Sequence, residues 1–557
     1  MKKLFLLLAV AILTTVVCHA EQFVNLTPAP ANMTVGTGVF RIPAGMKITA
    51  QGLTPEMQSE VTKFISDFNK STGLGIGEGK NGRMTVRLNK EIATEGYNLD
   101  VTAKGIVLEA SSPAGLFYGL QTIKKILPAN VMAGTNYPRQ KSYELPVVSI
   151  QDRPAYGYRG FMLDVSRHFF TADEIKRMLD VMSYYKLNRF HWHLTDDQGW
   201  RLPMDKYPLL TTVGATAPDV VITDYRAKKQ YKAGKPYGPY SYTKEEIKDI
   251  VDYAKKLHIE VVPEVDMPGH FVAAMVAYPE LSCDPKADRK VWDHGGVSRD
   301  VLNVANPAAV KLGEDVIDQL AELFPYPYIH IGGDECPTVA WENNADCRAL
   351  MEKEGMKNPR QLQNRFIKQM ADRAAKHGKK LYVWNEALTE EGADSAMLKN
   401  IDATVFCWVG VPQAVKKATS NGLGAIFTPI GPYYINRRQS RDAAPGAGPG
   451  NDDVKRTYTT VPFTTAVGSK DNCLGVQGTF WTEHVSDADY MEYLALPRLI
   501  AIAEAGWTPQ EKKDFADFQK RMTADAQLLD LGGYKYTRLY MLQPVGSSTG
   551  PDSPGRE

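Results

Sequence analysis

The chain has 557 residues, of which 43% are hydrophobic, and its formal net charge at pH 7 is +1. This length and this apolar content suffice for a large buried core and exclude a mostly disordered chain. The near balance of charges gives no global electrostatic support for a nucleic-acid partner, and none is expected.

Residues 1–20 have the three-part layout of a secretory signal. Two lysines precede an apolar run at residues 4–17, and small residues follow near Ala20. The run is too short for a membrane span and no longer one follows, so we expect no transmembrane segment in the mature chain. We therefore predict export to a periplasmic or extracellular location. Lipid anchoring at Cys18 is less favoured, because Val17 is bulkier than the residue expected before such a cysteine.

Residues 21–153 mix strand and helix patterns and are predicted to form a small α+β domain. Residues 146–154 have prolines at both ends and are predicted to be the region in which this domain gives way to the next. The patterns predict strands at residues 84–89, 97–101 and 106–110 and an amphipathic helix at residues 114–127.

In residues 154–545, short apolar strands alternate with helices, which is typical of parallel βα units. Eight such units predict a closed (β/α)8 TIM barrel rather than an open doubly wound sheet. Two of the helices begin with capping boxes, at Thr171 and Thr243. Residues 546–557 are expected to form a flexible tail. The predicted barrel strands are residues 159–165, 189–194, 260–265, 328–332, 380–384, 404–408, 425–430 and 474–481.

Two connections of the predicted barrel are long, residues 214–242 after the second strand and residues 436–473 after the seventh. Both are expected on the catalytic face, where long loops shape substrate access, although tolerated surface insertion remains the alternative. Five cysteines follow the predicted signal. Cys336 and Cys347 are close enough in sequence to pair, but buried or incidental thiols are the favoured interpretation of this odd, sparse set.

Acids and tryptophans stand at successive ends of the predicted barrel strands. Barrel active sites are assembled at the C-terminal ends of the strands. Carboxylates for proton transfer, combined with indole rings on which a pyranose can stack, are what a sugar-cleaving pocket requires. The residues at these ends are Asp164, Asp196, Glu264, Asp266, Asp334, Glu335, Trp384, Glu386, Trp408, Trp481 and Glu483.

The adjacent acids Asp334 and Glu335 are the strongest catalytic candidates. An isolated Asp-Glu pair is usually a solvated surface pair. Here, however, Gly332 and Gly333 precede the acids at the end of an apolar strand, and glycines let the backbone turn sharply and approach a ligand closely. A carboxyl in such a cleft can be kept protonated by desolvation and can act as a general acid.

Two other function classes are alternatives to hydrolysis of a glycoside. His191 and His193 share one face of a strand and could bind a metal, as in barrel metallohydrolases that cleave amides or esters. Later strand ends show tryptophans instead of further histidines, so hydrogen-bonded structural histidines are favoured, and neither a metal nor another cofactor is expected. A carbohydrate-binding protein without catalysis would share the tryptophans but would not need Asp334 and Glu335.

At these residues the sequence resembles the family 20 glycoside hydrolases, the β-N-acetylhexosaminidases. The resemblance implies an exo-acting enzyme that removes terminal N-acetylglucosamine or N-acetylgalactosamine from glycans. It also implies a retaining mechanism in which the substrate's own 2-acetamido oxygen attacks the anomeric carbon. The N-terminal residues are similar to the non-catalytic α+β domain of that family. The motifs are residues 159–168, 191–201, 263–270, 330–335 and 475–483, with Glu95 and residues 115–122 in the N-terminal domain.

The resemblance also assigns a role to each matching residue. Glu335 would protonate the leaving oxygen and then activate water, while Asp334 would orient the acetamido group and stabilise its developing positive charge. Asp196 and His270 would support Glu335 by hydrogen bonding. The implied substrate-binding residues are Arg167 and Glu483 at the sugar hydroxyls and Trp384, Trp408 and Trp481 around the acetamido group.

The sequence departs from the family pattern after the seventh strand. Where the family often has Tyr-x-Asp, this chain has Tyr434 and Asn436, with Tyr433 as the alternative register. The Tyr434 hydroxyl would donate to the acetamido oxygen. Asn436 would keep hydrogen bonding at C4 or C6 without a negative charge, which leaves the gluco or galacto preference open. The natural glycan, the oligomeric state and a homodimer also remain open.

Overall fold

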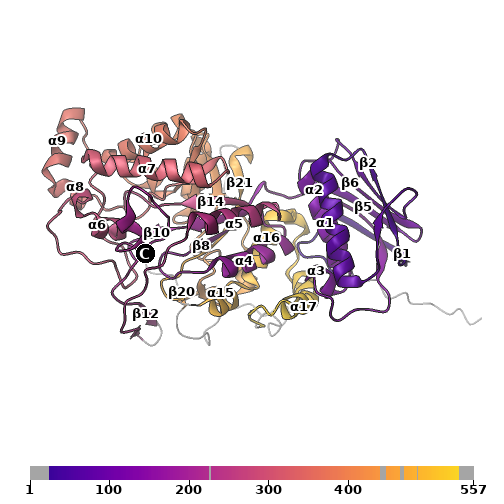
Figure 1. The fold of residues 1–557 in the computed structure, drawn as a ribbon. Helices are drawn as coiled ribbons and strands as arrows, with labels where there is room; N and C mark the ends of the chain where they lie inside the picture. Colours follow the sequence, from indigo (N-terminus) through magenta and orange to yellow (C-terminus); the bar gives the residue numbers. More distant parts are fainter. Residues whose placement is uncertain (1–23, 225–227, 440–446, 465–469, 486, 539–557) are drawn as a thin grey trace, which may run out of the picture.

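The computed structural model describes residues 24–224, 228–439, 447–464, 470–485 and 487–538. The predicted signal at residues 1–20 and the predicted tail at residues 546–557 lie outside the described residues. Figure 1 shows an N-terminal sheet with its helices at one end of the molecule and a larger barrel domain at the other.

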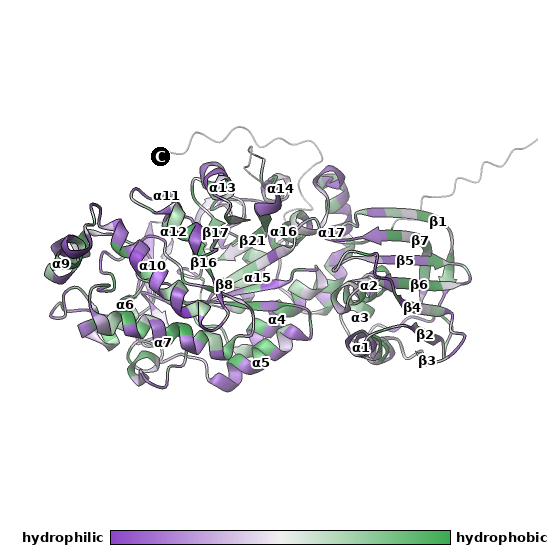
Figure 2. Cartoon of the chain, turned by 90° about the horizontal axis from the view of Figure 1, so that it is seen from above, coloured by the Kyte–Doolittle hydropathy of each residue, from purple (hydrophilic) through white to green (hydrophobic). Residues whose placement is uncertain are grey.

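The N-terminal domain is a seven-stranded sheet in the order β1-β7-β5-β6-β4-β2-β3. Helices α1 (Pro55–Thr72), α2 (Pro113–Ile126) and α3 (Ala129–Met132) lie on one side of the sheet, toward the barrel (Figure 2). The predicted strands and helix of this domain are confirmed to within two residues. The sheet strands are β1 (Asn32–Arg41), β2 (Lys47–Gln51), β3 (Gly77–Glu78), β4 (Met84–Leu88), β5 (Tyr97–Thr102), β6 (Gly105–Ala110) and β7 (Glu144–Asp152).

The region predicted as a boundary, residues 146–154, instead lies mostly in strand β7. Val148 and Ile150 are buried, whereas Ser149 and Gln151, which follow them in turn, are exposed. β7 pairs with β1 on one side and with β5 on the other. The alternation shows that one face of β7 packs on the domain core. Residues 146–152 are therefore the last strand of the N-terminal sheet, and the chain leaves that sheet only after Asp152.

Buried ion pairs join the N-terminal domain to the barrel. Asp152 lies 3.1 Å from the Lys186 ammonium and accepts a hydrogen bond from the Trp507 indole at 3.0 Å. Glu95 lies 2.8 Å from the fully buried guanidinium of Arg159 on the first barrel strand. Because a buried cation needs a paired anion, the domain supplies charges on which the barrel depends.

Eight parallel strands close into a barrel in the order β14-β15-β16-β17-β18-β21-β8-β9, which confirms the predicted TIM barrel. Several strands end before their predicted last residue, because the chain turns away to form the catalytic face. Helices α4 and α5 begin with the predicted capping boxes at Thr171 and Thr243. The barrel strands are β8 (Tyr158–Asp164), β9 (Arg189–His193), β14 (Glu260–Glu264), β15 (Tyr328–His330), β16 (Lys380–Trp384), β17 (Thr404–Cys407), β18 (Gly424–Phe427) and β21 (Cys473–Phe480).

Helices cover the outside of the barrel, and α7 carries hydrophobic and hydrophilic stripes in Figure 2. No helix in the described ranges is long and apolar enough to cross a membrane. The α-helices after the first strand are α4 (Ala172–Tyr184), α5 (Lys244–Lys255), α6 (Val272–Ala277), α7 (Pro307–Leu323), α8 (Val339–Asn343), α9 (Ala345–Glu354), α10 (Arg360–Ala375), α11 (Glu386–Thr389), α12 (Ser395–Asn400), α13 (Val411–Ser420), α14 (Val454–Thr459), α15 (Ala488–Ala495), α16 (Arg498–Trp507) and α17 (Phe515–Leu531).

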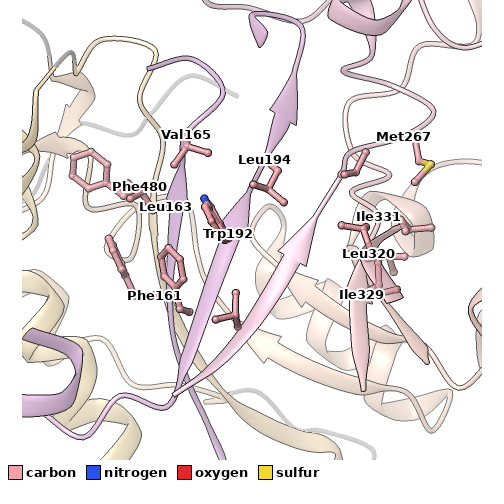
Figure 3. Close-up of a cluster of buried hydrophobic side chains, with 14 of the residues drawn as sticks. Phe161, Leu163, Val165, Trp192, Leu194, Met267, Leu320, Ile329, Ile331 and Phe480 are labelled. Atoms are coloured by element: carbon pink, nitrogen blue, oxygen red, sulfur yellow. The ribbon is translucent and has the colours of Figure 1, made fainter. Parts of the chain in front are cut away.

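Alternate residues of the barrel strands face different cores. Phe161 and Leu163 point outward and pack with the helices in the cluster drawn in Figure 3. Met162 between them points inward, where it joins Trp384 and Phe406 in the barrel interior. The same alternation directs His191 and His193 into the barrel.

The two long connections carry short strands of their own. Residues 214–242 contain the hairpin of β12 (Val221–Asp224) and β13 (Lys229–Lys232), and residues 436–473 contain β19 (Arg437–Arg438) and β20 (Gly448–Asn451). β10 (Thr195–Asp196) and β11 (Gly199–Trp200) form a further pair. Cys336 and Cys347 do not pair, and no disulfide joins any of the five cysteines in the described residues.

Candidate active site

A cavity of about 280 Å³ opens at the C-terminal ends of the barrel strands. It brings together ten of the eleven residues to which the family resemblance assigns a catalytic or substrate-binding role. Trp384 is the exception, because its side chain is fully buried behind the cavity and its ring centroid lies 6.0 Å from that of Trp481. The ten lining residues are Arg167, Asp196, His270, Asp334, Glu335, Trp408, Tyr434, Asn436, Trp481 and Glu483.

A tight turn after β15 directs the side chains of the two adjacent acids toward different partners. Gly332 and Gly333 have φ values of +67° and +89°, and Glu335 itself has φ of +40°. A Cβ atom on Gly332 would lie 1.8 Å from an oxygen of Asp266, so only glycine fits there. The left-handed conformation of Glu335 is unfavourable for a residue with a side chain and persists because the surroundings impose it. The turn brings Asp334 to Asp266 and Glu335 to His270.

Glu335 is the partly exposed end of a buried chain of polar contacts. Its carboxylate lies 3.4 Å from His270 Nε2, and His270 Nδ1 lies 3.1 Å from Asp196. Burial opposes the charge on His270, but Asp196 outweighs it, and the pKa of His270 is raised well above its usual range. Burial raises the pKa of Glu386, which accepts a hydrogen bond from the Glu335 backbone, to about 7. Glu335 is therefore held in place while its carboxyl reaches the cavity.

Asp334 forms a buried carboxyl pair with Asp266, and the two side chains are hydrogen-bonded to each other. Asp266 also accepts a hydrogen bond from the Gly333 backbone at 3.0 Å. Burial raises the pKa of Asp266 to about 8. Burial and the charge of Asp266 raise the pKa of Asp334 as well. Two carboxyls this close cannot both ionise easily, so the pair resists losing its protons at neutral pH.

Arg167 is a fixed cation at the side of the cavity. Its guanidinium lies 2.7 Å from Asp196 and 3.1 Å from Asp164, and its Nε donates to Gln198 at 2.8 Å. The same group lies 5.0 Å from the ring centroid of Trp481. These contacts give the planar donor one orientation, which suits it to hold neighbouring hydroxyls of a ligand.

Aromatic rings form the wall beside the acids. Trp408 and Tyr434 are stacked, with centroids 6.0 Å apart and an interplanar angle of 15°. Burial raises the pKa of Tyr434 well above its ordinary value, so its hydroxyl stays a donor. Tyr433 instead packs against Phe427 in the outer core, which decides the register in favour of Tyr434. An apolar wall with a hydroxyl donor suits an amide bearing a methyl group.

His191 and His193 share the inward face as predicted, and both contact the buried carboxylate of Glu264, at 3.0 and 2.5 Å. His330 lies 2.9 Å from the same carboxylate, and the Trp384 indole donates to it at 2.8 Å. Burial opposes protonation of His193, but Glu264 and Asp196 raise its pKa to about 10. These contacts match the structural role favoured for the histidines.

Three groups in and below the site bring acid and histidine atoms close enough to hold a metal ion. Most of these side chains have the protein contacts just described, and Asp197 lies 3.3 Å from His270 Nδ1. The groups are His191, Glu264 and His330; Asp196, Asp197 and His270; and Asp266, His270 and Asp334.

Several residues of the site had no individual role assigned from the sequence. Asp266 and Glu386 stand at strand ends, and this position could be read from the sequence. Their roles follow only from the contacts of Asp266 with Asp334 and of Glu386 with the Glu335 backbone. Arg437 and Gly448 also line the cavity, but they come from the connection after β18. Loop sequence carries no periodicity that would have placed them.

Two family models match the chain. The family 20 glycosyl hydrolase catalytic domain matches residues 156–510, and domain 2 of the same family matches residues 24–153. A β-hexosaminidase from Porphyromonas gingivalis is 36% identical over 95% of this chain and 66% of its own length, so the chain spans slightly less than two thirds of that relative. A β-hexosaminidase from Akkermansia muciniphila is 32% identical over 79% of this chain and 84% of its own.

A solved structure shares the whole two-domain arrangement. The exo-β-N-acetylglucosaminidase from Vibrio harveyi in complex with N-acetylglucosamine superposes with a TM-score of 0.80 and 28% identity, covering 92% of this chain and 78% of that chain. The catalytic-domain match alone spans more than half of the sequence. The chain therefore belongs to glycosyl hydrolase family 20.

Proposed function

We propose that the protein is an exo-acting β-N-acetylhexosaminidase that hydrolyses terminal, non-reducing N-acetylglucosamine or N-acetylgalactosamine by a retaining, substrate-assisted mechanism. One observation carries the proposal. The carboxyls of Asp334 and Glu335 both reach one cavity that also presents Trp408, Tyr434 and Trp481. A glycan with a terminal N-acetylhexosamine is accordingly the proposed partner.

Glu335 is proposed as the proton donor and later the base. Its carboxyl is 36% exposed, which is enough to reach a glycosidic oxygen, while His270 and Glu386 fix its position. His270, held between Asp196 and Glu335, orients the carboxyl of Glu335 by a side-chain contact. General acid catalysis requires such a positioned group, and the same group then takes a proton from the attacking water.

Asp334 and Tyr434 are proposed to turn the substrate amide into the nucleophile. The Tyr434 hydroxyl donates to the acetamido oxygen, and Asp334 accepts from the amide N–H as the nitrogen gains positive charge. The proton shared with Asp266 keeps Asp334 in one orientation. Holding the amide oxygen against the anomeric carbon makes the attack intramolecular, which removes much of its entropic cost.

The opposite end of the sugar is proposed to lie against Arg167 and Glu483. Arg167 would donate to the hydroxyls at C3 and C4, and Glu483 would accept from them. Arg167 is tied to Asp164 and Asp196, so this end of the cavity has little freedom to admit a further sugar. That closure favours exo action on the terminal residue of a chain.

The assay that tests the proposal is hydrolysis of aryl N-acetyl-β-glucosaminide and N-acetyl-β-galactosaminide by the purified protein, with the product anomer followed by NMR. First release of the β-anomer is the expected result, because two inversions retain configuration. Binding without release would favour a carbohydrate-binding protein, and first release of the α-anomer would contradict the retaining mechanism.

Replacing Asp266 by asparagine is expected to move the alkaline limb of the kcat/KM profile upward. The pKa of Asp266 is raised to about 8, so Asp266 keeps its proton below that pH and becomes charged above it. In the wild type the added charge then disturbs Asp334. The asparagine amide cannot ionise and keeps donating. Profiles from pH 5 to 10 check this, and an alkaline limb that stays in place would show that another group controls it.

Hydrolysis is expected to survive removal of metal ions. Glu264 already receives contacts from His191, His193, His330 and Trp384, so no cation is needed to balance its charge. Prolonged dialysis against a chelator, followed by the aryl-glycoside assay, should leave the rate within about twofold. Loss of activity that zinc restores would revive the metallohydrolase alternative.

Export is proposed from the signal-like residues 1–20, and N-terminal sequencing of protein recovered outside the cytoplasm tests it. Lipid anchoring at Cys18 would instead retain the protein in the membrane fraction.

A homodimer stays a prediction, which the mass of the purified protein in solution checks.

A further inference from the structure

Two cysteine thiols lie in contact outside the active-site cavity. Cys283 is half-buried, and Cys347 is buried in the first turn of α9. The two side chains are hydrogen-bonded to each other. Helix α9 lies at the end of the barrel domain away from the N-terminal sheet (Figure 1). Cys347, which is close to Cys336 in sequence, therefore has Cys283 as its thiol partner in space.

The N-cap residue of α9, Asn344, joins the backbones of the two cysteines. Its Nδ2 donates to the carbonyl oxygen of Cys283 at 2.9 Å, and its Oδ1 accepts from the backbone N–H of Cys347 at 2.9 Å. One carboxamide group thus bridges both residues. Two cysteines held by the same short side chain, with their thiols in contact, can be joined by a disulfide without movement of distant segments.

Asn303 anchors the same place from a second segment. Its backbone N–H donates to the carbonyl of Leu281 at 2.9 Å, and its Oδ1 accepts from the Cys347 thiol at 3.3 Å. Ser282 and Leu302, which adjoin these residues, form an antiparallel β-bridge. The two ends of the segment that follows Ser282 and ends at Leu302 therefore meet beside Cys347.

The segment between these ends, residues 284–301, is the cavity loop. Gly296 and Val297 of this loop line the active-site cavity. The carbonyl of His294 accepts a hydrogen bond from the side chain of Gln198 at 2.7 Å, which ties the middle of the loop to the barrel mouth. A covalent bond at the base of the cavity loop would therefore restrict a segment that forms part of the cavity wall.

We propose that Cys283 and Cys347 form a disulfide when the chain meets a disulfide oxidant, and that this bond fixes the base of the cavity loop. The Cys283 sulfur attacks the oxidant R–S–S–R, whose S–S bond breaks, and one R–SH leaves with the proton of Cys283. The Cys347 sulfur then attacks Cys283 in the mixed disulfide, and the second R–SH leaves with the proton of Cys347. The protein loses two electrons and two protons, and the oxidant gains them.

The positions of the two thiols match these steps. Cys283 is the more exposed of the pair, so the oxidant reaches it first. The contact with Cys283 lowers the pKa of the Cys347 thiol, although burial opposes this, and the first turn of a helix also favours a thiolate. Disulfides form and persist in oxidising compartments, and the export proposed above leads the chain to one.

The first test maps the cysteines of the wild-type protein. The purified protein is incubated with oxidised glutathione, digested in acid without reductant and analysed by mass spectrometry. The expected product is a pair of peptides linked through Cys283 and Cys347, with two hydrogens fewer than the separate peptides. Folded protein in which both thiols stay free, or in which Cys347 is linked to Cys336, overturns the proposal. The mapping needs no variant, so it decides even if a substitution prevents folding.

The second test measures the cavity loop. Lys286 and Lys290 are exposed in this loop, and trypsin cleaves after lysine. Cleavage at these two sites should be at least about threefold faster in the reduced wild-type protein than in the oxidised one, because opening of the loop exposes its backbone to the protease. Equal rates in the two forms would overturn the claim that the bond fixes the loop.

C283S tests whether this effect belongs to the proposed bond. Its loop should be cleaved at the same rate with and without reductant, since the disulfide cannot form. C473S is the matched control, because Cys473 is the other cysteine of intermediate burial and lies on β21. This variant should keep the dependence on reductant. A dependence that persists in C283S, or that disappears in C473S, contradicts the assignment to Cys283 and Cys347.

Discussion

Replacing Glu335 by glutamine is expected to lower kcat for an aryl N-acetyl-β-glucosaminide by two to four orders of magnitude, the usual contribution of a general acid. The amide keeps the shape of the side chain and its contact with His270, but it has no proton to give. KM should change little, because the carboxyl contributes to the transition state more than to ground-state binding.

The loss should grow as the leaving group becomes more basic, because a basic leaving oxygen depends more on protonation. The substitution should therefore lower kcat more for a disaccharide substrate than for an activated aryl glycoside. Glu390→Gln makes the same chemical change on an exposed side chain four residues beyond Glu386 and should leave the rate unaltered. Near-wild-type turnover by folded Glu335→Gln would defeat the assignment of the proton donor.

Asp334→Asn is expected to lower kcat by about a hundredfold to a thousandfold, with a smaller change in KM. The substitution removes the negative charge that balances the amide nitrogen, and a misplaced amide oxygen no longer attacks efficiently. It also removes one member of the carboxyl pair with Asp266, so the second carboxyl loses its partner. Asp205→Asn, on an exposed side chain, is the matched control.

The role of the acetamide can be measured independently of folding. An aryl β-glucoside, which has a hydroxyl in place of the acetamide, should be a very poor substrate for the wild type. The Asp334→Asn variant should lose most of its advantage on the acetamide substrate over that glucoside. If the wild type cleaves both glycosides equally fast, Asp334 cannot be acting through the substrate's own amide.

Much of the site was predictable because parallel strands in a barrel end on one face. Short apolar runs alternating with helices were enough to predict eight strands, and the acids at their ends then had to converge. Gly332 and Gly333 marked the turn that carries Asp334 and Glu335. Spacing alone also placed His191 and His193 on the inward face, where both contact Glu264.

The sequence by itself determined the elements, the faces of the strands and the acids that meet at the barrel mouth, since these follow from local periodicity and strand direction. Only the tertiary structure decided that Trp384 stands behind the cavity, that Tyr434 rather than Tyr433 lines it, and that Arg437 reaches the cavity. Those outcomes depend on contacts between segments far apart in the chain. Side-chain direction at a loop or strand end is set by what packs against it, and no local pattern encodes that partner.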